Sequence, residues 1–168
     1  MKKLMKSQVL TVALAMLTMP LFAQINVGGG IAFGSEIENL GFTAKGTYSI
    51  NEQWEGAASF TYFIPKSFGT IDWTLWALNL DGHYLKNVNE KFTIYPLAGL
   101  SIGGFTFDNN FSFGGVDGGK TTTTEVGINL GGGAYLGISE KMKGYAEIKY
   151  IVGGFDQLVL NAGVLFNL

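Results

Sequence analysis

From Gln157 to Leu168, apolar side chains alternate with small or polar ones. Side chains along a strand point alternately to opposite faces, so this alternation predicts one strand with an apolar face and a small, polar face. The same pattern recurs along the whole chain after residue 24. The apolar face of this last strand carries Leu158, Leu160, Ala162, Val164, Phe166 and Leu168.

The alternation predicts eight strands joined by connections of two kinds. The strands are expected at Ile25–Gly34, Leu40–Ile50, Trp54–Ile64, Trp76–Tyr84, Phe92–Phe105, Thr122–Ile138, Lys143–Val152 and Gln157–Leu168. Each offers about ten residues, close to the roughly 9–11 that a tilted strand needs to cross a bilayer. Short turns on the side of both termini and mostly longer loops opposite are typical of bacterial outer-membrane barrels. We therefore predict an all-β fold, an eight-stranded antiparallel up-and-down transmembrane β-barrel.

Two local features depart from this regular pattern. Ile71, Trp73 and Leu75 place apolar side chains in the opposite phase to the strand that follows, which predicts a bulge or an extension above the membrane. Pro96 has no backbone donor, so it predicts a local irregularity in its strand. Aromatic residues also gather near the strand ends as two expected girdles. These are Tyr48, Trp54, Tyr84, Phe92 and Phe166 at one end and Phe33, Phe42, Tyr62 and Trp76 at the other.

Alternation alone does not distinguish a membrane barrel from a secreted soluble barrel such as a lipocalin, whose apolar face points inward. The composition of the polar face favours the membrane barrel. It consists largely of Gly, Ala, Ser, Thr and Asn, whereas a face in water would be dense in charge. Charged residues make up 14% of the chain, against roughly 25% in soluble domains. We expect the apolar face to contact lipid.

Side chains nearly fill the space inside an eight-stranded barrel, so a plugged lumen is expected rather than an open pore. The polar face carries a few charged residues that would lie in this space. Because a buried charge without a partner is costly, we expect them to pair across the lumen. They are Lys45, Glu55, Asp81, Glu147 and Lys149.

The N-terminus is typical of a secretory signal peptide. Lysines at positions 2, 3 and 6 precede an apolar stretch, Val9–Phe22, and Ala23 is a plausible cleavage residue. The stretch is shorter than the roughly 20 residues of a spanning helix. We expect a signal peptide at residues 1–23 and a barrel at residues 24–168. The chain has no cysteine, and its formal charge of -2 without a basic cluster argues against nucleic acid as a partner.

Three short segments resemble the small OmpA/OmpX-like outer-membrane barrels of Gram-negative bacteria. They are Tyr95-Pro96 followed by Gly99, the run Gly131–Tyr135, and the C-terminal pattern of Asn161, Gly163, Phe166 and Leu168. The resemblance covers about residues 24 to 168. It implies insertion into the bacterial outer membrane, contact with outer-membrane lipid, and reading of the C-terminus by the barrel-assembly machinery. The family usually ends in an aromatic residue, whereas this chain ends in leucine. A monomer is expected.

A catalytic role has little support in the residues. An outer-membrane lipid enzyme would need a base beside a nucleophile or a second carboxylate. The one histidine, His83, lies two positions from Asp81 on the same face. His83 either forms an acid–base pair with Asp81 or is a hydrogen-bonded interior histidine, and we favour the second interpretation. Glycine runs within strands do not form phosphate cradles, because no helix follows them. We predict no enzyme activity, no cofactor and no metal site.

The longest connection, Thr106–Lys120, is the remaining functional candidate. Phe107, Phe111 and Phe113 lie among its glycines. Exposed aromatic residues on a scaffolded loop bind partners, but the same residues could extend two strands beyond the membrane. The sequence therefore predicts envelope structure or surface interaction through extracellular loops. A narrow porin-like channel is the alternative, and a lipid-modifying enzyme is third.

Overall fold

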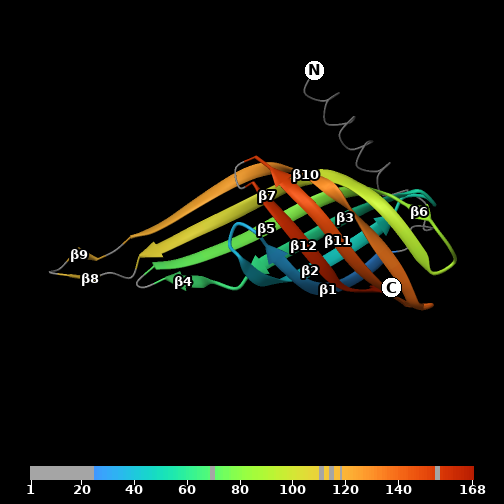
Figure 1. Ribbon diagram of the computed structural model, residues 1–168, viewed down its shortest axis with the longest axis horizontal. Helices are drawn as coiled ribbons and strands as arrows, with labels where there is room; N and C mark the ends of the chain where they lie inside the picture. Colours follow the sequence, from blue (N-terminus) through green and yellow to red (C-terminus); the bar gives the residue numbers. More distant parts are fainter. Residues whose placement is uncertain (1–24, 69–70, 110–111, 114–115, 118, 154–155) are drawn as a thin grey trace, which may run out of the picture.

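Eight long antiparallel strands close into a barrel in the computed structural model (Figure 1). It describes residues 25–168 apart from 69–70, 110–111, 114–115, 118 and 154–155. The long strands are β1 (Ile25–Gly34), β2 (Asn39–Ser49), β3 (Trp54–Phe63), β5 (Ile71–Tyr84), β7 (Phe92–Asn109), β10 (Lys120–Ser139), β11 (Met142–Val152) and β12 (Gln157–Asn167). Four short ones are β4 (Lys66–Phe68), β6 (Lys86–Asn87), β8 (Ser112–Phe113) and β9 (Val116–Asp117). Pairing of β1 with both β2 and β12 closes the barrel.

The predicted orientation of the two faces is confirmed. Phe42 is 65% exposed and Ile31 is 56% exposed on the outside, while their neighbours Thr43 and Ala32 are buried inside. The nine aromatic residues expected in girdles all belong to the outward phase of their strands. A barrel with an apolar exterior and a polar interior is stable only where something other than water covers its outside.

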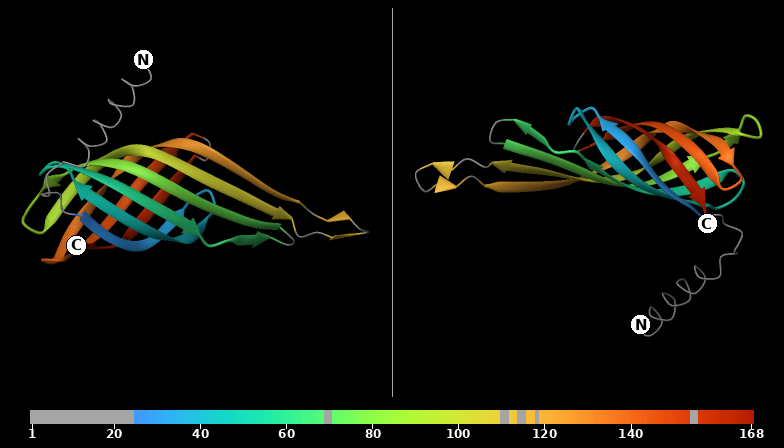
Figure 2. Two further views of the ribbon diagram at one scale, coloured as in Figure 1. Left: turned by 180° about the vertical axis from the view of Figure 1, so that it is seen from behind. Right: turned by 90° about the horizontal axis from the view of Figure 1, so that it is seen from below.

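Strand β5 contains no bulge, so the first alternative for Ile71, Trp73 and Leu75 is wrong. The second alternative, an extension of the strand, is confirmed. Its register with β7 runs unbroken from Ile71–Asn109 to His83–Leu97. The apolar side chains of Trp73 and Leu75 share the inward phase because the strand simply continues beyond the barrel (Figure 2). No helix among the residues that the structure describes is long and apolar enough to cross a membrane.

The irregularity predicted at Pro96 is also confirmed. Pairing with β7 stops at His83–Leu97 and resumes, in the same register, at Lys86–Ile94. The interruption lies opposite Pro96, where the missing N–H leaves the ladder without a donor. Leu85 instead donates its backbone N–H to Gln53 on the other side, at 2.7 Å.

Three strands project past the rest of the barrel as a sheet that we name the tongue. It comprises residues 71–77 of β5, 103–109 of β7 and 120–127 of β10, with β4 at its edge. Strand β10 meets β11 only from Ile128 onward. Figure 1 shows this sheet extending from one end of the barrel, opposite the end where the C-terminus lies.

Candidate functional site in the barrel lumen

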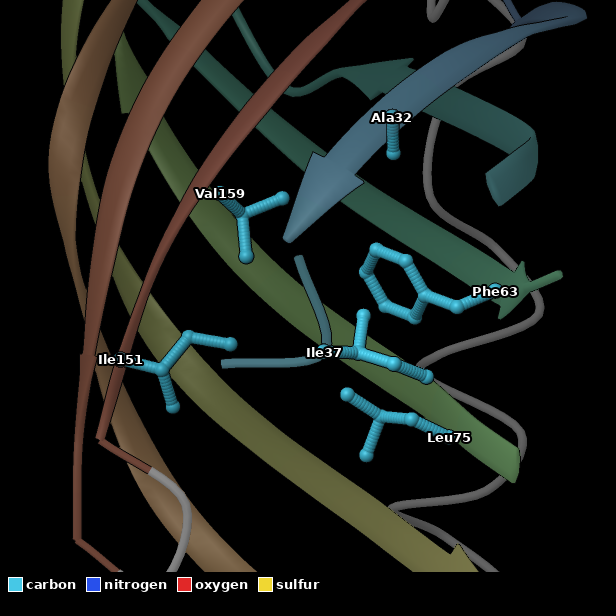
Figure 3. Close-up of a cluster of buried hydrophobic side chains, with 6 residues drawn as sticks. All are labelled: Ala32, Ile37, Phe63, Leu75, Ile151 and Val159. Carbon is cyan, nitrogen blue, oxygen red and sulfur yellow. The ribbon is translucent and has the colours of Figure 1, made fainter. Parts of the chain in front are cut away.

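An apolar cluster lies inside the barrel at the end beneath the tongue (Figure 3). The turn between β1 and β2 folds inward and places Ile37, which is 3% exposed, in the middle of this mouth cluster. Glu38 adopts a φ of 51° in this turn, a left-handed conformation that sharply redirects the backbone. Lys66 of β4 holds the Glu38 carboxylate at 2.9 Å. The mouth cluster consists of Ala32, Ile37, Phe63, Leu75, Ile151 and Val159.

Below the mouth cluster, the structure brings the five charges expected in the lumen into ion pairs. Lys45 of β2 pairs with Glu147 of β11. Lys149 of β11 lies 3.1 Å from the Asp81 carboxylate of β5. Glu55 of β3 pairs with a lysine of β11 outside the predicted set. Each of these pairs joins strands that are not neighbours in the barrel, so each ties opposite walls together.

Four members of this lumen network were missed by the sequence reasoning. Lys143 lies 3.2 Å from Glu55, and the Tyr135 hydroxyl donates to the same carboxylate. The Tyr95 hydroxyl donates to Glu147 at 2.8 Å. Asn129 donates to Asp81 at 2.6 Å. Tyr95, Asn129 and Tyr135 all occupy inward positions of their strands. This inward phase is visible in the sequence and could have indicated that they belong to the lumen network.

His83 does not form the pair with Asp81 that the sequence suggested as a catalytic possibility. Its Nδ1 lies 3.1 Å from Oε1 of Glu55, while Asp81 binds Lys149 and Asn129 instead. The imidazole is fully buried and stacks on the ring of Tyr95, with centroids 4.4 Å apart. Its surroundings are those of a hydrogen-bonded interior histidine.

The other end of the lumen opens into a cavity of about 260 Å³, which we name the vestibule. It lies between the short turns, and the network forms its inner wall through Glu55, Tyr135 and Lys143. The Lys143 ammonium sits 3.9 Å from the centre of the Tyr135 ring. The lumen network therefore borders the vestibule at the short-turn end, and the mouth cluster lies at the tongue end.

The tongue carries one of the three phenylalanines of the segment Thr106–Lys120, namely Phe107. Phe107 lies within β7, so the segment Thr106–Lys120 is partly strand. On the inner face of the tongue, the Trp73 ring contacts Phe105 and Phe107 with centroids 5.6 and 5.9 Å apart. Trp73 is 40% exposed. Phe113 lies in β8, and Phe111, like the predicted signal peptide at residues 1–23, lies outside the described residues.

The outward face of the tongue is polar, which reverses the pattern of the barrel. Thr74, Thr106 and Thr122 form one row across its three strands, and the hydroxyls of Thr106 and Thr122 lie 3.1 Å apart. Where the outer face meets lipid it is apolar, and where it meets water it is polar. The reversal, next to Trp76, marks the level at which the apolar surroundings end.

Three residues of the predicted assembly signal occupy ordinary strand positions in β12, and Leu168 directly follows that strand. Asn161 points inward and accepts a hydrogen bond from the Tyr145 hydroxyl at 3.3 Å. Phe166 lies on the outer face, and Leu168 donates its N–H to the Ile25 carbonyl at 3.0 Å. A Cβ on Gly163 would lie 2.2 Å from a β1 carbonyl oxygen, so only glycine fits there.

No protein-family model and no curated protein sequence matches this chain. Solved structures do match its fold. Ail, the attachment invasion locus protein of Yersinia pestis, is 18% identical with a TM-score of 0.62, over 87% of this chain and 97% of that one. The N-terminal β-barrel domain of Pseudomonas aeruginosa OprF is 17% identical with a TM-score of 0.66, over the same shares. A major outer membrane protein from Thermus thermophilus is 10% identical with a TM-score of 0.67, over 88% and 100%. The predicted fold, that of the small outer-membrane barrels, is confirmed.

Proposed function

We propose that this protein is a non-catalytic outer-membrane barrel, closed to solutes, that binds an extracellular polypeptide through its tongue. The observation that carries the proposal is the reversed pattern of the tongue. Its inner face presents Trp73, Phe105 and Phe107 above the closed mouth, in a region whose outer face is polar. An aromatic surface held on a rigid sheet in water is a typical contact surface for another protein.

The free edge of β10 supports a polypeptide as the partner. Residues 120–126 pair with β7 on one side, and no strand of the described chain pairs with their other side. An unpaired edge offers backbone donors and acceptors to an added strand. Such a strand would lie beside Thr121 and Thr123, which share the inner face with the aromatic side chains. Ail, whose fold this chain shares, has attachment and invasion in its name.

Removing the aromatic side chains from the tongue is expected to weaken partner binding about tenfold or more. The test compares bacteria displaying the double variant Trp73→Ala/Phe107→Ala with wild type for adhesion to extracellular-matrix polypeptides. The matched control, Thr74→Ala/Thr106→Ala, changes the opposite face of the same two strands and should bind like wild type. Wild-type adhesion by the aromatic variant, with normal surface display, would leave the barrel with a structural role only.

Closure of the lumen predicts that the purified barrel gives no discrete conductance steps in planar bilayers. The mouth cluster around Ile37 blocks one end, and cross-lumen ion pairs fill the middle. Single-channel recording, with a known porin as the positive control, checks this. Regular steps of uniform size would instead favour the narrow channel that the sequence left as an alternative.

A further inference from the structure

We propose that His83 is a proton-controlled switch that competes with Lys45 for Glu147 and responds to the pH at the short-turn end of the barrel. This inference goes beyond the tongue and its partner. It concerns the one buried ring in the described part of the lumen whose two nitrogens face carboxylates from two different strands.

The first step assigns the protons of the imidazole. Nδ1 lies 3.1 Å from Oε1 of Glu55, and an ionised carboxylate only accepts, so Nδ1 carries an N–H. In the neutral ring, Nε2 is then an acceptor. It is buried, has no hydrogen-bond partner among the described residues, and faces Oε1 of Glu147 at 3.8 Å. Two acceptors face each other until a proton is added to Nε2.

The groups that contact the ring or its two carboxylates come from five other strands. Tyr95 stacks on one side, and the Tyr135 hydroxyl lies 3.3 Å from Nδ1. Beyond the two carboxylates, Lys143 pairs with Glu55 and Lys45 pairs with Glu147. The charged and titratable groups of this shell are Lys45 (β2), Glu55 (β3), Tyr95 (β7), Tyr135 (β10), and Lys143 and Glu147 (β11).

The second step concerns Oε1 of Glu147, the oxygen that would accept a hydrogen bond from a protonated Nε2 of His83. Oε1 of Glu147 already accepts from Lys45 and from the Tyr95 hydroxyl. An oxygen with two lone pairs has no site left for a third strong donor. An imidazolium repels the Lys45 ammonium but not a neutral hydroxyl. Protonation of His83 therefore weakens the link between Lys45 and Glu147, which joins β2 to β11 across the lumen.

The third step is the direction from which protons arrive. Glu55 contacts His83 directly and also lines the vestibule, which opens between the short turns. The mouth cluster of Ile37 and its neighbours separates His83 from the tongue end. Among the described residues, the cavity that borders Glu55 is at the short-turn end, so we assign the access of water to that side.

Nitrogen-15 NMR of the imidazole tests the proposal, because the chain has a single histidine. The barrel is labelled with ¹⁵N-histidine, purified without a histidine tag and placed in lipid nanodiscs. Between about pH 8 and pH 5, where histidine changes charge, we expect a neutral ring protonated at Nδ1 to become an imidazolium. A ring that keeps one protonation state over this whole range, or a neutral ring protonated at Nε2, would overturn the proposal.

Two further measurements test the competition with Lys45 and the side from which protons arrive. Lys45→Met removes the competing cation and should shift the pH midpoint of His83 protonation by about one pH unit. The exposed control Lys66→Met should leave this midpoint unchanged. If Lys45→Met does not fold, the Lys45 ¹⁵Nζ signal of the wild type must change with the same midpoint as the ring. In vesicles with one barrel orientation, the ring should follow the pH of the short-turn side. A ring that follows the tongue side contradicts the assigned access.

Discussion

Replacing Glu147 with alanine is expected to lower the free energy of unfolding by about 3–5 kcal/mol, because Lys45 is then left charged and buried. Lys45 is 4% exposed, and no other carboxylate in the described part of the chain lies within ion-pair distance of its ammonium. Tyr95 also loses the acceptor of its hydroxyl. Urea unfolding in detergent micelles, followed by tryptophan fluorescence, measures the effect. Glu90→Ala, which changes an exposed turn residue, is the matched control.

The reciprocal change and the double replacement show whether the pair or the charge is responsible. Lys45→Ala leaves Glu147 buried without its cationic partner and should also destabilise the barrel strongly. Lys45→Met/Glu147→Leu removes both charges together and should recover most of the lost stability, since a buried ion pair replaced by apolar groups is often neutral. Single variants that unfold like wild type would mean that water already solvates these charges inside the barrel.

The barrel could be predicted from the sequence because its evidence is local. A period of two along a dozen residues is visible in one strand, and it already separates the face of Phe42 from the face of Lys45. Which face pointed outward followed from how little charge the polar face carries. Neither the strand pattern nor the direction of the apolar face requires knowing which strands are neighbours, so the structure confirms both predictions.

The partners inside the lumen could not be predicted in the same way. Whether Glu55 pairs with Lys143 or Lys149 depends on the register of the strands around the closed barrel. This register cannot be inferred from any short segment of the sequence. The inward phase did reveal Tyr95 and Tyr135, but an inward tyrosine is equally compatible with a packing role. Their function as donors to two carboxylates depends on contacts between walls that only the closed barrel brings together.

The tongue shows why the sequence left a loop and an extension of two strands as equal alternatives. Above the bilayer the outer face of a strand meets water, so its apolar residues change sides without any break in the backbone. At Trp73 this change looked like a possible bulge, and at Phe107 it looked like an aromatic loop. Both are explained by one continuous sheet that leaves the apolar surroundings near Trp76.

A single methyl group inside the barrel is expected to be more disruptive than the same group on its outside. The Cβ of Gly99→Ala would lie 2.2 Å from the Leu80 carbonyl oxygen and 2.3 Å from an Asp81 carboxylate oxygen. The first contact is with the backbone of the paired strand β5, and the second is with a member of the lumen network. Neither atom moves away without breaking the strand ladder or the hydrogen bond from Asn129 to Asp81, so the cost should reach or exceed the roughly 1–3 kcal/mol typical of overpacking.

Gly56→Ala provides the matched control for this change. Gly56 lies on the outward face of β3, and a Cβ there would meet no atom within 4 Å. Alanine also restricts the unfolded chain, so this variant should be neutral or more stable by about 0.4–1 kcal/mol. Urea titration and the gel shift on heating, which separates folded from unfolded barrels, measure both variants. Equal stability of the two would mean that the lumen yields to an added methyl, which would contradict the close packing described for β5 and β7.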